Sequence, residues 1–166
     1  GVPKLHSGRS AQATEHGTIS LSFRQQFAMQ IRKAVITAAA PAQARLPLQS
    51  VVDRNGSVRT ALELLLDDIS GNTEIEETAI VICPGMSETY RQATGPHAQR
   101  VLFIEQDQPR GYGDALLRAR DFVEGSPFLH LVSDHLYVSR NGQSCAQQLI
   151  EVARREQCAV SAIHAT

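Results

Sequence analysis

The stretch IRKAVITAA at residues 31–39 decides the architecture of this chain, because an apolar strand runs there into a loop of small residues. Two later stretches complete the pattern. QDQPRGYGDAL at residues 106–116 turns through two glycines into a helix, and FLHLVSDH at residues 128–135 is an apolar strand that ends on a carboxylate. A strand with its loop, a glycine turn and an acid at the end of a strand suit a site for a phosphorylated nucleotide and a metal ion.

Apolar runs alternate with helical patterns along the rest of the chain. Continuous apolar strands separated by helices indicate an α/β domain of three layers, with a mostly parallel, Rossmann-like sheet and helices on both faces. We expect the strands at 34–38, 100–105 and 128–132 to lie inside the sheet, with Gly111 and Asp134 on one rim, because ligands bind beyond the carboxyl ends of such strands. The remaining expected elements are strands at 78–83 and 158–163 and helices at 19–30, 57–69 (with Ser57 as N-cap), 86–93, 114–123 and 144–156.

Length and composition bound the function classes. The 166 residues suffice for one domain, expected over 19–166 after a flexible arm at 1–18. A net charge of -1 gives no basic field for nucleic acid or a membrane surface, and no apolar run approaches the ~20 residues of a membrane span. Three widely spaced cysteines form no disulfide framework or metal pattern, which favours a reduced, cytoplasmic compartment.

Each candidate site residue also has a plain structural interpretation. The turn at Gly111 lets a base or phosphate approach the backbone, but it is also compatible with an ordinary loop. Asp134 can hold Mg²⁺, or it can cap a turn. His130 and His135 are not spaced as a metal pair, so we interpret them as a hydrogen-bonded core histidine and a loop residue. Asp67 and Asp68 are most simply solvated surface.

Three common motifs are absent. The sequence has no Gly-x-x-x-x-Gly-Lys-Ser/Thr loop, no Gly-x-Gly-x-x-Gly after the first strand and no Gly-x-Ser-x-Gly elbow. These absences exclude a P-loop, count against a dinucleotide fingerprint and count against an α/β-hydrolase. Lys4 and Lys33 are the only lysines, so any chemistry that needs a mobile ammonium depends on one of them.

Taken in order, the segments resemble the nucleotidyltransferases that make sugar nucleotides, and most closely the bacterial UTP–glucose-1-phosphate uridylyltransferases. Residues 32–39 resemble the opening strand of that family, and residues 106–116 its Gln-x-x-Pro-x-Gly-x-Gly-x-Ala segment. Residues 128–134 resemble its strand leading into Gly-Asp, and residues 149–163 the helix and strand that follow. The resemblance covers residue 31 to the end and implies a nucleotide-diphospho-sugar transferase-like fold.

The resemblance implies attack of a sugar 1-phosphate on the α-phosphorus of UTP, with release of pyrophosphate. It implies UTP or another nucleotide as ligand, a sugar 1-phosphate as partner and Mg²⁺ as cofactor, and it leaves a homo-oligomer open. The implied roles are uracil contact for Gln106 and Gly111, nucleoside contact for the backbone of Ala38 and Ala39, Mg²⁺ binding for Asp134 and, as the nearest catalytic cation, Arg45.

The glycine loop departs from the family pattern. The family's Gly-x-Gly-Thr-Arg falls on Ala-Pro-Ala-Gln-Ala at residues 40–44, and Arg45 comes one place late. Proline has no N–H, and alanine methyls block close approach of a phosphate to the backbone. The family's loop lysines and sugar-binding half are missing, so we expect a domain truncated at its C-terminal end and impaired or inactive as this chain. The alternative is a non-catalytic nucleotide-binding or regulatory module that keeps the fold.

Overall fold

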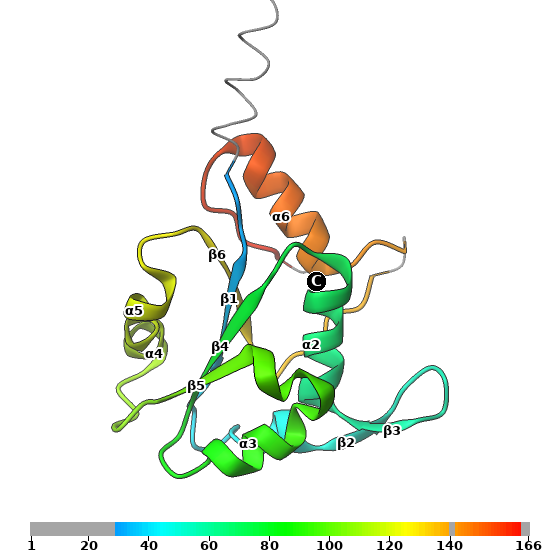
Figure 1. Cartoon of the computed structure of the whole chain (residues 1–166), viewed down its shortest axis with the longest axis vertical. Helices are drawn as coiled ribbons and strands as arrows, with labels where there is room; N and C mark the ends of the chain where they lie inside the picture. The colour runs from blue at the N-terminus through cyan, green and yellow to red at the C-terminus, as the bar shows by residue number, and fades with distance from the viewer. Residues whose placement is uncertain (1–28, 140–141, 164–166) are drawn as a thin grey trace, which may run out of the picture.

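The computed structural model describes residues 29–139 and 142–163 (Figure 1). The expected arm at 1–18 and nearly all of the expected helix at 19–30 lie outside the described residues. Residues 29–32 are described and are neither helix nor strand. None of the helices in the described part is long and apolar enough to cross a membrane.

A four-stranded parallel sheet forms the centre, in the order β5-β4-β1-β6. The strands are β1 (Lys33–Ala38), β4 (Glu77–Ile82), β5 (Val101–Glu105) and β6 (Phe128–Val132). The expected parallel sheet is therefore confirmed. The expectation that the strands at 100–105 and 128–132 lie inside it is wrong, because β5 and β6 form the two edges of the described sheet.

Helices cover both faces of this sheet (Figure 1). The pleat sends Ala34 and Ile36 to one face, where they pack with residues of α2 (Ala61–Asn72), α3 (Ser87–Ala93) and α6 (Cys145–Glu156). Val35 points to the other face, against α4 (Tyr112–Arg118) and α5 (Arg120–Val123). Strands buried on both faces explain why the sequence reads as continuous apolar runs.

The expected helix start at Ser57 is wrong, because a hairpin occupies that segment. β2 (Ser50–Val52) pairs antiparallel with β3 (Val58–Thr60). Between them Asp53 Oδ1 accepts hydrogen bonds from the N–H groups of Asn55 (2.8 Å) and Ser57 (2.9 Å), which closes the turn. Thr60 is the true N-cap of α2, and its hydroxyl accepts the N–H of Glu63 at 3.0 Å.

Two further boundaries differ from the sequence expectation. The helix expected at 114–123 begins earlier, at Tyr112, and divides at Ala119 into α4 and α5. The strand expected at 158–163 does not form. A strand needs a hydrogen-bonding neighbour, and within the described residues nothing pairs with this segment. Two short 3-10 helices, η1 (Leu46–Leu48) and η2 (Gly95–Arg100), complete the elements.

Candidate functional site

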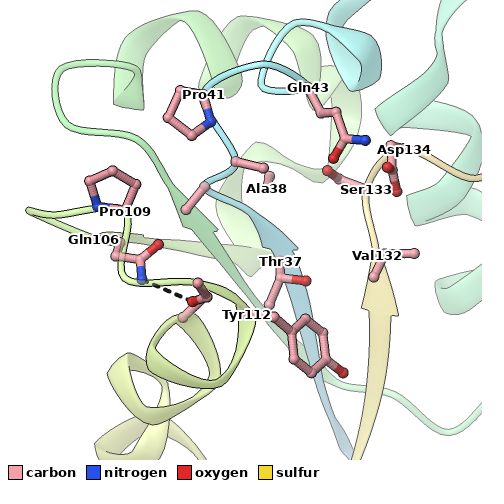
Figure 2. A pocket seen from close by; sticks show the side chains of 14 residues that line it. Thr37, Ala38, Pro41, Gln43, Gln106, Pro109, Tyr112, Val132, Ser133 and Asp134 are labelled. Atoms are coloured by element: carbon pink, nitrogen blue, oxygen red, sulfur yellow. Dashed lines mark hydrogen bonds between the residues drawn. The ribbon is translucent and has the colours of Figure 1, made fainter.

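A cavity of about 300 Å³ opens at the carboxyl ends of β1 and β6 (Figure 2). Its position is the one expected for a ligand in a parallel α/β sheet. The wall comes from the end of β1 and its loop, from the turn between β5 and α4, and from the end of β6. The lining residues are Thr37, Ala38, Ala39, Ala40, Pro41, Gln43, Gln106, Pro109, Gly111, Tyr112, Ala115, Val132, Ser133 and Asp134.

Most of the residues singled out in the sequence lie together here. Ala38, Ala39, Gln106, Gly111 and Asp134 all line this cavity, and Gly111 and Asp134 therefore share one rim, as expected. The exposed residue before η1, Arg45, is not among the lining residues. Of the expected site residues, Arg45 is therefore the one that does not line this cavity.

Gln106 is the most constrained polar group of the site. Its side chain lies in a residue only 3% exposed, and its Nε2 donates to Asp114 Oδ2 at 2.7 Å and to the Gly111 carbonyl at 3.3 Å. A carboxylate and a carbonyl can only accept, so the network assigns the amide nitrogen to them and turns Oε1 away, toward the cavity (Figure 2). Among the described residues no donor satisfies Oε1.

The Asp114 carboxyl group, which accepts the hydrogen bond from Gln106, has a pKa below its usual value. The hydrogen bond from Gln106 lowers the pKa of the Asp114 carboxyl, and the neighbouring Arg118 guanidinium, 3.5 Å away, lowers it further. The sequence analysis did not assign a role to Asp114. In the sequence, Asp114 is an acid eight residues after Gln106, and this spacing alone does not predict a contact between the two side chains.

Asp134 is the one charged side chain of the wall. It is 17% exposed, and its Oδ1 lies 2.8 Å from Nδ1 of the exposed His135. His135 is thus the loop residue beside the acid, as expected. Within the described residues no group of three or more His, Cys, Asp or Glu side chains could hold a metal ion. A cation at Asp134 would therefore need oxygen ligands from the bound molecule.

His130 contacts two residues of the cavity wall, Thr37 and Tyr112. Its Nε2 lies 3.2 Å from Thr37 Oγ1, and its Nδ1 lies 2.9 Å from the hydroxyl of Tyr112, whose ring meets it edge to face. Burial lowers the pKa of His130, so the ring is neutral at neutral pH. The expected hydrogen bonding of His130 is confirmed, but the residue is half-buried and not part of the core. Sequence reasoning missed Thr37 and Tyr112 as wall residues.

The loop after β1 folds on itself. The Gln43 N–H donates to the Ala40 carbonyl at 2.9 Å, and the Leu46 N–H donates to the Gln43 carbonyl at 2.9 Å. The buried Tyr90 hydroxyl donates to the Ala44 carbonyl at 2.7 Å and ties the loop to α3. Ala44 itself is buried, so the position where the family pattern has an arginine faces the protein rather than the cavity.

Lys33 is not available to the site. Its Nζ donates to the Phe122 carbonyl at 2.6 Å and to Glu124 Oε2 at 3.1 Å. These contacts tie the start of β1 to the end of α5, at the opposite end of the strand from the cavity. Lys33 is the sole lysine in the part of the chain that the structure describes, so no described lysine can neutralise a phosphate in the cavity.

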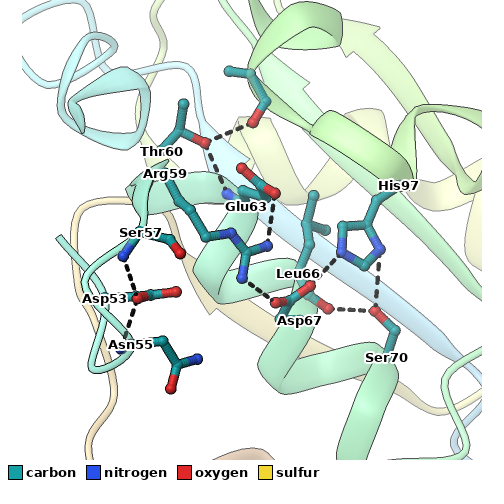
Figure 3. Close-up of polar contacts among 11 residues, drawn as sticks. Asp53, Asn55, Ser57, Arg59, Thr60, Glu63, Leu66, Asp67, Ser70 and His97 are labelled. Carbon is teal, nitrogen blue, oxygen red and sulfur yellow. Dashed lines mark hydrogen bonds and ion pairs between the residues drawn. The ribbon is translucent and has the colours of Figure 1, made fainter. Parts of the chain in front are cut away.

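A second polar cluster lies beside α2 (Figure 3). Arg59 donates to Glu63 at 2.7 Å and to Asp67 at 2.6 Å, and His97 Nε2 lies 2.7 Å from Asp67. Burial raises the pKa of Asp67, but the hydrogen bonds from Arg59 and His97 outweigh it and leave the pKa below its usual range. Asp67 is 42% exposed, as expected of a solvated acid, but it also links β3, α2 and η2 through Arg59 and His97. Burial raises the pKa of its neighbour Asp68.

Sequence comparison connects this geometry to known proteins. No protein-family model matches the chain. The chain is 28% identical over 106 residues to the UTP–glucose-1-phosphate uridylyltransferase of Streptococcus pyogenes. The match covers 63% of this chain and 33% of the relative. UTP–glucose-1-phosphate uridylyltransferase 1 of S. pyogenes serotype M1 matches with the same identity and coverage. The chain thus spans about a third of the length of the curated relatives it matches.

Solved structures share the fold. The UTP-bound UGPase from Acinetobacter baumannii superimposes with a TM-score of 0.59 at 22% identity, covering 77% of this chain and 54% of that one. The inositol-1-phosphate CTP transferase from T. maritima gives 0.56 at 12% identity, covering 77% and 50%. The chain is related to the nucleotidyltransferases, and its parallel sheet with helices on both faces is the nucleotide-diphospho-sugar transferase fold.

Proposed function

We propose that this chain binds a uracil nucleotide in the cavity and that the chain alone does not catalyse nucleotidyl transfer. The carrying observation is the fixed amide of Gln106, whose oxygen faces the cavity because Asp114 and the Gly111 carbonyl hold its nitrogen. The names of two similar proteins include UTP, which agrees with a uracil nucleotide as the ligand.

The orientation of Gln106 selects the base. Uracil carries an N3–H donor that the Oε1 acceptor satisfies, whereas cytosine presents an acceptor at the same ring position. An acceptor left facing an acceptor in a buried site costs about 1–3 kcal/mol. The fold alone does not choose between the two bases, because its solved examples include a UTP-bound protein and a CTP transferase.

The affinity is modest. A uridine moiety has about 17 non-hydrogen atoms, and at ~0.3 kcal/mol per atom they supply about 5 kcal/mol, or a Kd of roughly 0.2 mM. No lysine among the described residues lines the cavity, and the N–H groups of Gln43 and Leu46 are donated to carbonyls of their own loop. We therefore expect UTP binding no tighter than high micromolar.

Mg²⁺ fits this site only together with a ligand. Asp134 is the residue that would hold the ion, and the phosphates of a nucleotide would have to supply the remaining oxygen contacts. When bound, the ion would neutralise phosphate charge. Asp134 would hold the ion from the end of β6, where His135 already contacts one of its carboxylate oxygens.

The cations that transfer requires are missing. Transfer of a nucleotidyl group depends on charge stabilisation, and losing a single such donor costs roughly 10²–10³ in rate. Within residues 29–139 and 142–163 no Lys or Arg lines the cavity, and Arg45 lies outside it. We expect no UDP-sugar formation from UTP and glucose 1-phosphate, and no binding of the sugar phosphate.

Calorimetric titration of the purified chain with UTP and CTP tests the base assignment. We expect UTP to bind at least fivefold more tightly than CTP, and Gln106→Ala to abolish this difference. Gln108→Ala is the matched control, because Gln108 lies on the same loop and bonds only to Arg110 in the described structure. Equal binding of UTP and CTP by the wild-type chain would refute the base assignment.

A pyrophosphate-release assay with UTP, glucose 1-phosphate and Mg²⁺ tests the absence of turnover. Steady release that disappears in Asp134→Ala would show a complete enzyme and contradict the proposal. In titrations, Mg²⁺ should tighten the binding of UTP, and Asp134→Asn should remove that gain.

A further inference from the structure

We propose that the cavity recognises its ligand as an uncharged uracil nucleoside, so that without a divalent cation uridine binds at least as tightly as UTP. This inference rests on the proposed function, because it takes the base to lie against Gln106. The proposed function concerns which base is bound. The inference concerns which part of the nucleotide, the nucleoside or the phosphates, contributes the affinity.

The electrostatics of the wall oppose a triphosphate. Asp134 is the only charged side chain among the lining residues, and it is an acid. Its partner His135 is 65% exposed and carries a positive charge only when protonated. A triphosphate brings several negative charges close to this carboxylate, and the partly enclosed site screens their repulsion less than bulk water does.

The backbone of the loop after β1 offers little to an anion. Phosphate sites in α/β folds use free N–H groups of a glycine loop or of a helix N-terminus. Here Pro41 has no N–H, and the N–H groups of Gln43 and Leu46 are donated to carbonyls of the same loop. Ala40 lines the cavity at a position where the family's loop has glycine, and a residue with a methyl group leaves less room for a phosphate near the backbone.

The arginines nearest to the turn are already engaged. Arg110 donates both Nε and Nη2 to Gln108 Oε1, at 3.1 and 2.8 Å. Arg118 lies against Asp107 and Asp114, at 3.6 and 3.5 Å. Moving either guanidinium to a phosphate would break these contacts and, for Arg118, weaken the support of the acid that orients Gln106.

The same wall suits a ribose. The two ribose hydroxyls are donors, and the Asp134 carboxylate is an acceptor, which is the complementarity that acidic residues use on ribose in dinucleotide-binding folds. A volume of about 300 Å³ is at the lower end of ligand pockets and is enough for a nucleoside. Asp134 therefore attracts the sugar and repels the phosphates.

Calorimetry of the full chain with uridine, UMP and UTP in EDTA tests this inference. We expect the Kd of uridine to be equal to or below that of UTP. Added NaCl should tighten UTP, because it screens the repulsion, and leave uridine unchanged. Asp134→Asn should tighten UTP at least threefold and should not tighten uridine. Asp121→Asn is the matched control, since it removes the same charge from a side chain that is 91% exposed and outside the cavity, and it should change neither ligand.

The outcomes separate this inference from the proposed function. UTP binding measurably tighter than uridine in EDTA would overturn the inference and leave a uracil-nucleotide site standing. Failure of all three uracil compounds to bind would overturn the proposed function, and the inference with it.

Discussion

Gly111→Ala and Gly113→Ala form a matched pair that tests how the turn before α4 is built. Gly111 has φ +98° and ψ 179°, a conformation that residues with a Cβ rarely adopt, whereas Gly113 lies inside α4 without a positive φ. A Cβ added at either glycine meets nothing within 4 Å. The two substitutions therefore differ in backbone conformation and not in packing.

The expected effects have opposite signs. Strain at Gly111 costs about 1–3 kcal/mol, while alanine at Gly113 gains up to ~1 kcal/mol from helix propensity and a less flexible unfolded chain. The variants should thus differ by about 1–4 kcal/mol. For a chain of 166 residues this corresponds to roughly 2–16 °C in Tm.

Urea denaturation followed by circular dichroism measures both free energies of unfolding, with the m-value as a check that the unfolded state is unchanged. Gly111→Ala should also weaken uridine binding, because the Gly111 carbonyl helps to orient Gln106. Equal losses of stability in the two variants, or a larger loss at Gly113, would refute the argument from backbone strain.

Three further predictions concern single side chains. Tyr90→Phe removes the bond to the Ala44 carbonyl and should lower the unfolding free energy by about 1–3 kcal/mol in urea denaturation, and a loss below ~0.5 kcal/mol would argue against that bond. Burial lowers the pKa of His130, so the folded state takes up a proton on this ring less readily than the unfolded state. The wild-type unfolding free energy should therefore not depend on His130 above pH ~6.5, and it should fall as the pH drops below that value. His130→Gln should flatten that decline when stability is measured from pH 5 to 8, and an unchanged slope would contradict the assignment. Arg59→Met should raise the pKa of Asp67, followed by carboxyl NMR titration, and an unmoved pKa would show that Arg59 does not hold it down.

The sequence by itself determined the central strands and the place of the cavity. The apolar runs that became β1, β4 and β6 are read within two residues of their true bounds, because burial on both faces of a parallel sheet leaves a local signature. The QxxPxGxG segment and the acid after β6 placed Gln106, Gly111 and Asp134 correctly on one wall. The start of α2 at Thr60, in place of the expected Ser57, follows a Thr-x-x-Glu capping pattern.

Tertiary structure decided what these residues can do. The orientation of Gln106 depends on Asp114, the ring of His130 on Thr37 and Tyr112, and the position of Ala44 on Tyr90. Local periodicity reports which face of an element is buried, but it carries no information on which distant side chain meets which. Strand order, the hairpin at β2 and β3 and the direction of each hydrogen bond are fixed only when segments far apart in the chain pack together.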